Sequence, residues 1–152
     1  MEMTAQMWIA LVVGLAATVE DVVWRRISNW IPLAALAGGL GWQVADKGWP
    51  GIGWAALGSL SGFSVFLVFY LLGGMGGGDV KLMAGFGALL GAGRLLEAAL
   101  WTAMIGGLLA MIVIAAGAIR RRLSKAPRAA GPQFIPYAPA ITVGVWMSLV
   151  PR

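Results

Sequence analysis

Aspartate and glutamate are the main candidates for chemistry in this chain of 152 residues, because it contains no histidine and no cysteine. That composition excludes Ser-His and Cys-His nucleophiles, disulfides, and metal sites built on histidine or cysteine. Acid–base groups must therefore come from Asp, Glu, Lys, Tyr or Arg. Of the six acidic residues, Glu2, Asp46 and Glu97 are expected to be solvated or to lie at a helix terminus.

Asp21 is the first acidic residue whose surroundings favour a function. It follows Glu20 at the end of a long apolar stretch. Ionisable residues at membrane depth cost roughly 2.5–3.5 kcal/mol on insertion scales and are usually paired or functional. The alternative is an interfacial carboxylate balanced by Arg25, which lies four residues further along a helix.

Asp79 is the second, and it directly follows Gly76-Gly-Gly78. One interpretation is a helix N-cap preceded by a glycine loop. The other assigns a role to the glycines, since residues without Cβ atoms permit positive φ and the close approach of another backbone. That space would let an extended peptide lie beside the Asp79 carboxylate.

Apolar stretches must position these residues. The chain is 60% hydrophobic and 11% charged, with a mean hydropathy of +0.85, which is typical of membrane proteins. We expect an all-α polytopic membrane protein that forms one transmembrane domain over residues 1–152, with a first helix that is not cleaved as a signal peptide. Six transmembrane helices are predicted at Met7–Val23, Trp30–Val44, Ile52–Leu72, Val80–Gly93, Leu95–Ile119 and Phe134–Val150. The second and fourth are short, so they must borrow flanking residues or be shielded by protein.

The basic residues predict the orientation. The segments between successive predicted helices lie alternately on the two sides of the membrane. The first, third and fifth of these segments hold eight basic residues: Arg25, Arg26, Lys81, Arg120, Arg121, Arg122, Lys125 and Arg128. The opposite side holds three: Lys47, Arg94 and Arg152. The positive-inside rule then places both termini outside the cytoplasm and Asp21 and Asp79 at the cytoplasmic face. The loop Arg120–Arg128 fixes orientation or binds anionic lipid, and no basic patch indicates nucleic-acid binding.

Two carboxylates at one membrane face can converge. Because neighbouring acids do not both ionise easily, one would act as general base on water while the other, protonated, polarises a carbonyl. The sequence does not assign these roles, although the dipole of the fourth helix would favour charge on Asp79.

Three segments together resemble the type IV prepilin peptidases, which are aspartyl proteases with a Gly-x-Gly-Asp motif. Asp21-Val-Val-Trp-Arg-Arg-Ile-Ser-Asn29 is similar to their first aspartate motif, and Gly76-Gly-Gly-Asp-Val-Lys-Leu82 to their second. Ile135-Pro-Tyr-Ala-Pro-Ala140 resembles the start of their last helix. The resemblance covers nearly the whole chain.

The resemblance implies removal of the short basic leader of a prepilin or pseudopilin in the cytoplasmic membrane, without a metal or organic cofactor. It implies that Asp21 and Asp79 are catalytic and that Gly76, Gly78, Lys81, Asn29 and Pro136 support the site or bind substrate. Lys81 steadies the carboxylates, binds an acidic substrate residue, or merely anchors the topology.

Two departures from the family pattern matter. Ser28 stands where the family often has proline, which we expect to be tolerated. There is no cysteine-bearing N-terminal methyltransferase domain, so the chain resembles the short, peptidase-only form found with tight-adherence pili. Archaeal preflagellin peptidases share the same logic and are not fully separated by sequence.

Two other classes of protein stay open. A small transporter would use membrane acids to relay protons or bind ions, with a water-filled path and a half-helix at the site. A structural subunit of a pilus machine would keep Asp79 as a cap and Asp21 as an anchor. The exact substrate and the oligomeric state are not given by the sequence.

Overall fold

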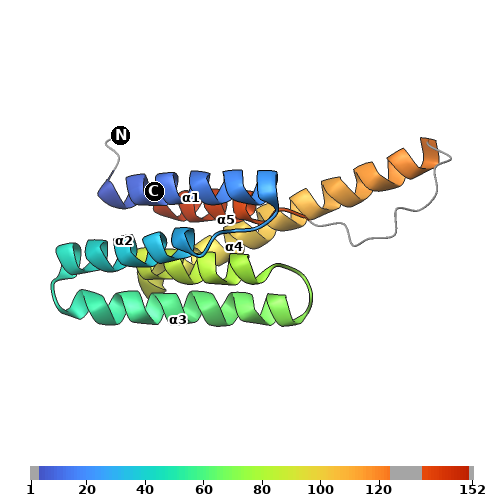
Figure 1. Ribbon diagram of the computed structural model, residues 1–152. Coiled ribbons are helices and arrows are strands. Elements are labelled where there is room, and N and C mark those ends of the chain that lie inside the picture. Colours follow the sequence, from blue (N-terminus) through green and yellow to red (C-terminus); the bar gives the residue numbers. More distant parts are fainter. Residues whose placement is uncertain (1–3, 124–134, 151–152) are drawn as a thin grey trace.

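The computed structural model describes residues 4–123 and 135–150, and the side chains of residues 4–119 and 135–150. Within these ranges the chain is entirely helices and their connections, which confirms the all-α prediction (Figure 1). Most of the predicted loop Arg120–Arg128 and Arg152 lie outside the described residues. The helices are α1 (Ala5–Trp24), α2 (Trp30–Lys47), α3 (Pro50–Leu71), α4 (Gly77–Leu123) and α5 (Ala138–Leu149).

Local sequence explains where the first helices begin and end. The Thr4 hydroxyl caps α1 by accepting the Met7 N–H at 3.3 Å, as N-cap threonines do. The helix ends where Arg25 adopts the left-handed conformation, with φ of 53°. After α2, Gly48 has φ of 66° and lets the chain turn, and Pro50 occupies the first position of α3, where its missing N–H has no cost.

Helix α4 is broken at Gly91, whose φ of 69° and ψ of 170° are not helical. The chain reverses here, as the contacts of α3 show. Gly58 lies against Gly87 and Gly91, whereas Gly62, one turn later, lies against Met83 and Leu95. Residues 77–90 therefore run antiparallel to α3, and residues 92–123 run parallel to it.

Side chains of other helices bind the backbone at the C-terminal end of residues 77–90, just before the break. The Leu89 carbonyl accepts from the Gln6 amide at 2.7 Å and from the Gln43 amide at 3.3 Å. Gln43 is buried, and its oxygen accepts from the Lys47 ammonium group at 2.9 Å. These side chains satisfy a carbonyl that the helix leaves free, which an apolar environment requires.

The break lies at Gly91, slightly before the gap that the sequence placed near Arg94. Only glycine adopts this conformation without strain. The position of the helix break is therefore set by the backbone freedom of Gly91 and not by the charge of Arg94. The last helix begins at Ala138, and Phe134, where the prediction began it, lies outside the described residues. The short second stretch does borrow flanking residues as predicted, because α2 continues to Lys47.

Glycines bring α3 and α4 into backbone contact. The sequence pairs Gly58/Gly62 and Gly87/Gly91 have the small-xxx-small spacing of close helix packing. A Cβ at Gly87 would collide with the carbonyl of Gly58, and one at Gly62 would lie 2.6 Å from the carbonyl of Met83. The spacing is therefore used for packing.

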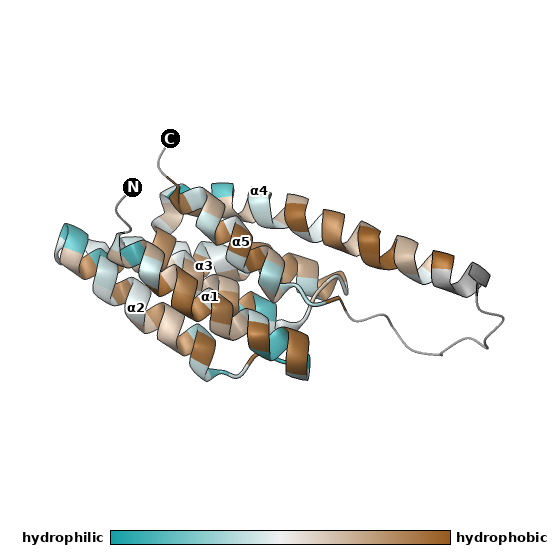
Figure 2. Cartoon of the chain, turned by 90° about the horizontal axis from the view of Figure 1, so that it is seen from above, coloured by the Kyte–Doolittle hydropathy of each residue, from teal (hydrophilic) through white to brown (hydrophobic). Residues whose placement is uncertain are grey.

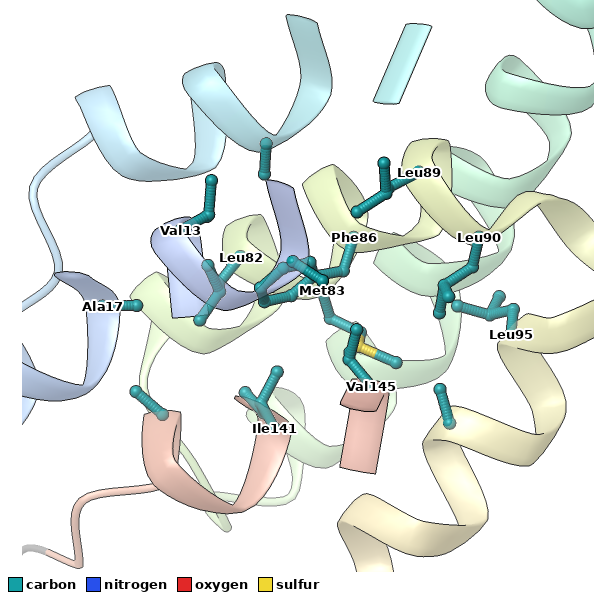
Figure 3. Packing of buried hydrophobic residues seen from close by; sticks show 14 of the residues in the cluster. Val13, Ala17, Leu82, Met83, Phe86, Leu89, Leu90, Leu95, Ile141 and Val145 are labelled. Atoms are coloured by element: carbon teal, nitrogen blue, oxygen red, sulfur yellow. The ribbon is translucent and has the colours of Figure 1, made fainter. Parts of the chain in front are cut away.

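Residues 77–90 form the centre of the bundle. Leu82, Met83, Phe86 and Leu89 are fully buried, and Figure 3 shows Met83 and Phe86 in the middle of the hydrophobic cluster. A helix that is apolar on every side suits such a position. Its shortness follows from shielding by protein, and its first turn carries Asp79 into the interior of one end of the bundle.

Among the described residues, three helical stretches are long and apolar enough to cross a membrane: Ala5–Trp24, Pro50–Leu71 and Gly77–Ile119. Hydrophobic residues cover most of the helices, and hydrophilic ones gather near helix ends (Figure 2). The chain is a membrane protein by these features. α5 is apolar but shorter, so the expected six spans stay a prediction.

Candidate active site

Asp21 lies in the last turn of α1 and is 3% exposed. Its Oδ2 accepts the backbone N–H of Ala138 at 3.0 Å. Ala138 is the first residue of α5, a helix that has no side-chain cap of its own. Asp21 thus supplies the missing acceptor from another helix, at an end where the helix dipole favours a carboxylate.

Asp79 lies in the first turn of α4 and is 4% exposed. It is not the N-cap residue that one interpretation of the sequence proposed. Its Oδ2 reaches back to accept the N–H of Gly76 at 3.1 Å, as an acidic residue does at the third position of a capping box. Its Oδ1 is buried and has no hydrogen-bond partner among the described residues, so this oxygen is available as an acceptor.

One cavity of about 220 Å³ joins the two aspartates. Its lining consists of Asp21, Arg25, Arg26, Ile27, the glycines Gly76, Gly77 and Gly78, and Asp79. Both carboxylates thus contribute to the lining of the same space, one from α1 and one from α4. Because arginine stays protonated, the two carboxyl groups are the lining groups that can exchange protons. The arrangement suits acid–base hydrolysis of a backbone amide.

The glycines beside Asp79 allow a neighbouring segment to pack closely against the start of α4. A Cβ on Gly78 would lie 3.2 Å from the Cβ of Ile27. Positive φ, which the sequence also suggested for this run, occurs in the turn at Gly73 and not at Gly76, Gly77 or Gly78. The glycines therefore let the turn between α1 and α2 pack directly on the first turn of α4.

Side chains around the cavity fix that same turn. The Glu20 carboxylate accepts the N–H of Ser28 at 2.6 Å. A proline, which the family often has at this position, would have no N–H to donate. Lys81 donates to the Asn29 side chain at 3.0 Å and is exposed.

Not every predicted site residue meets the carboxylates. Gly76 and Gly78 do line the cavity. Lys81 and Asn29 pair with each other, outside its lining, and Pro136 lies two residues before the Ala138 N–H that binds Asp21. Lys81 and Asn29 thus hold α4 to the start of α2 without contacting the carboxylates.

Ala138, Arg25 and Arg26 lie within the segments that resemble the family, but they are not among the predicted site residues. Ala138 contributes its backbone N–H, a group that cannot be recognised from the residue type. The arginines were assigned to membrane orientation, yet both line the cavity. Arg25 did carry a structural signal, because a non-glycine residue with φ of 53° is uncommon and often marks a functional site.

Comparisons with known proteins show the family of this chain. The prepilin leader peptidase/N-methyltransferase of Bacillus subtilis (strain 168) is 34% identical over 90 residues, which cover 58% of this chain and 32% of the relative. The chain thus corresponds to about a third of that protein's length. No solved structure is significantly similar. The profile of the type IV leader peptidase family matches residues 8–111, which include both aspartates. Since that match spans more than half of the chain, the protein belongs to the type IV leader peptidase family.

Proposed function

We propose that this protein is an aspartic endopeptidase that uses Asp21 and Asp79 to remove the N-terminal leader of type IV prepilins or pseudopilins. The observation that carries the proposal is the shared cavity: two buried aspartates from α1 and α4 line one opening. The name of the Bacillus subtilis relative supports the choice of substrate. Membership of a peptidase family supports the reaction class.

The reaction needs only water and the two carboxyl groups. The ionised carboxylate takes a proton from water as the oxygen attacks the scissile carbonyl carbon. The protonated partner donates to the carbonyl oxygen, and a proton then passes to the leaving nitrogen as the C–N bond breaks. Both carboxylates lie at helix N-termini, Asp79 in α4 and Asp21 against α5. The α5 dipole favours charge on Asp21 as the α4 dipole does on Asp79, whereas the C-terminal end of α1 opposes it. We therefore assign the two roles to the coupled pair and not to either residue.

The proposed membrane arrangement has six spans, with α4 contributing one on each side of Gly91. Helix direction alternates along the chain in this scheme. The turn after α1, the turn before α4 and residues 135–137 then lie together at the cytoplasmic face, and both termini lie opposite. The hydrogen bond from Ala138 to Asp21, and the cavity that Asp21 and Asp79 both line, support this clustering.

The decisive test is cleavage of a prepilin from the same genome, co-expressed with the protein and followed by intact mass. Asp21→Asn and Asp79→Asn should each abolish leader loss, because a positioned acid or base contributes about 10²–10⁴-fold. Asp46→Asn is the matched control, since Asp46 is exposed and does not line the cavity. All variants are first shown to reach the membrane in equal amounts.

Normal cleavage by both aspartate variants would refute the catalytic assignment and return these residues to capping and anchoring. The transporter alternative expected a half-helix at the site. The observed break at Gly91 instead lies beside Gln43, which is outside the cavity of the aspartates, so the structure offers that alternative no support.

A further inference from the structure

A second cavity, of about 350 Å³, opens between α3 and residues 92–123. Its walls include Val65, Phe66 and Phe69 of α3 and Leu96 and Leu100 of α4. We call it the apolar groove. Its size falls within the range of ligand sites, about 300–1,000 Å³.

The apolar groove exists because two helices diverge. Gly62 still contacts Leu95 near the break, and further along residues 92–123 lean away from the bundle (Figure 1). The side chains left along the opening stay exposed, with Leu96 at 68% and Leu100 at 60%. In a membrane protein this opening faces hydrocarbon.

Small residues on α4 line the apolar groove at helical spacing. Ala99, Ala103, Gly106 and Gly107 all contribute to its lining. Such spacing brings helices close together, and Gly107 has no atom within 4 Å of the place where its Cβ would be. Among the described residues no helix covers this face at Gly107.

The apolar groove reaches the residues that precede the hydrogen-bond donors of both aspartates. Met75 lines the groove and is followed by Gly76, whose N–H binds Asp79. Tyr137 also lines it and is followed by Ala138, whose N–H binds Asp21. Consecutive Cα atoms are about 3.8 Å apart, so two residues that line the groove are immediate chain neighbours of the main-chain groups that hold the aspartates.

We propose that the apolar groove binds an apolar transmembrane helix of the substrate, directly joined to the segment that is cut. Residues 96–107 measure about 17 Å along α4, which matches three turns of a helix. One face of that helix would pack on Ala99, Ala103 and Gly107, and the chain would unwind near Met75 to pass Asp79. This rests on the proposed function and explains how such a protease selects membrane-anchored substrates.

Photo-cross-linking tests the site without requiring cleavage. In the full chain carrying Asp79→Asn, a photoreactive side chain replaces either Ala103, in the groove, or Met104, which is 65% exposed outside it. The probe is a prepilin peptide that contains the leader and the following apolar segment, in lipid vesicles. We expect strong cross-linking from position 103 and little from position 104. Equal cross-linking from both positions would overturn the proposal and leave the groove to lipid chains.

Two tryptophan variants, one inside the groove and one outside it, test whether the groove contributes to substrate binding. Gly107→Trp fills the groove, whereas Gly93→Trp adds the same side chain where the structure also shows open space, outside the groove. Gly107→Trp should raise the KM for the long peptide about tenfold, the worth of one buried apolar side chain. It should leave unchanged the cleavage of a short peptide that lacks the apolar segment.

An unchanged KM for the long peptide in Gly107→Trp would also refute the groove. The outcome for the proposed function is read separately. Cleavage that survives in Asp21→Asn and Asp79→Asn refutes the aspartic mechanism, whereas loss of position-specific cross-linking refutes only the groove.

Discussion

At the scale of residues, main-chain groups orient both catalytic candidates. Asp21 is held by the N–H of Ala138 and Asp79 by that of Gly76. The sequence predicts the two aspartates and the glycines, because few acids occur and their contexts differ. It cannot predict the donor at Ala138, since every residue except proline has a backbone N–H and only tertiary structure selects one.

Gly78 and Gly77 offer a matched test of close approach. A Cβ on Gly78 would be 3.2 Å from Ile27, whereas one on Gly77 would be 3.7 Å from Tyr70, an ordinary contact. Gly78→Ala should therefore displace the turn that carries Ile27 and lower kcat/KM severalfold, and Gly77→Ala should cost less. Peptide-cleavage kinetics measure both. A larger loss in Gly77→Ala would show that space beside Ile27 does not limit activity.

At the scale of elements, the break at Gly91 makes two segments out of one helix. Hydropathy predicts a boundary between the fourth and fifth stretches and places it near Arg94. The sequence cannot choose among several nearby glycines, because the choice depends on contacts made elsewhere. Gln43 and Gln6 make those contacts with Leu89, and their role is invisible without the packed bundle.

Gly91→Ala is expected to destabilise the protein by about 1–3 kcal/mol, the usual cost of a sparsely populated backbone conformation. Gly91 has φ of 69°, and an added Cβ would lie 2.9 Å from the Gln43 amide nitrogen. Gly93→Ala is the control, since its Cβ meets no atom within 4 Å and alanine raises helix propensity. Thermal unfolding in detergent compares them. An equal or higher Tm for Gly91→Ala than for wild type would contradict this account.

At the scale of the whole molecule, the alternating helix directions gather three distant segments at one end of the bundle. Counting gaps along the sequence predicts that Asp21 and Asp79 share a face. It does not predict that residues 77–90 occupy the centre, because the stretches differ little in hydropathy and burial follows from packing. Leu82 and Phe86, both fully buried, show this central position.

The absence of native cysteine makes the proposed orientation easy to test. Leu72→Cys and Trp49→Cys place single thiols at exposed positions in successive turns, 77% and 83% exposed. With an impermeant maleimide, Trp49→Cys should react in intact spheroplasts, and Leu72→Cys only after lysis. The unsubstituted chain controls for background labelling. The reverse pattern would place the aspartates on the extracytoplasmic side.

The bond between Asp21 and Ala138 also bears on timing during synthesis. In the proposed membrane arrangement both aspartates are inserted with α1 and α4, but the N–H that holds Asp21 arrives only with α5. A nascent chain that has inserted four helices therefore carries both acids without the geometry that aligns them. Proteolytic competence would then begin only when the last helix docks, which spares neighbouring membrane proteins from a half-made protease.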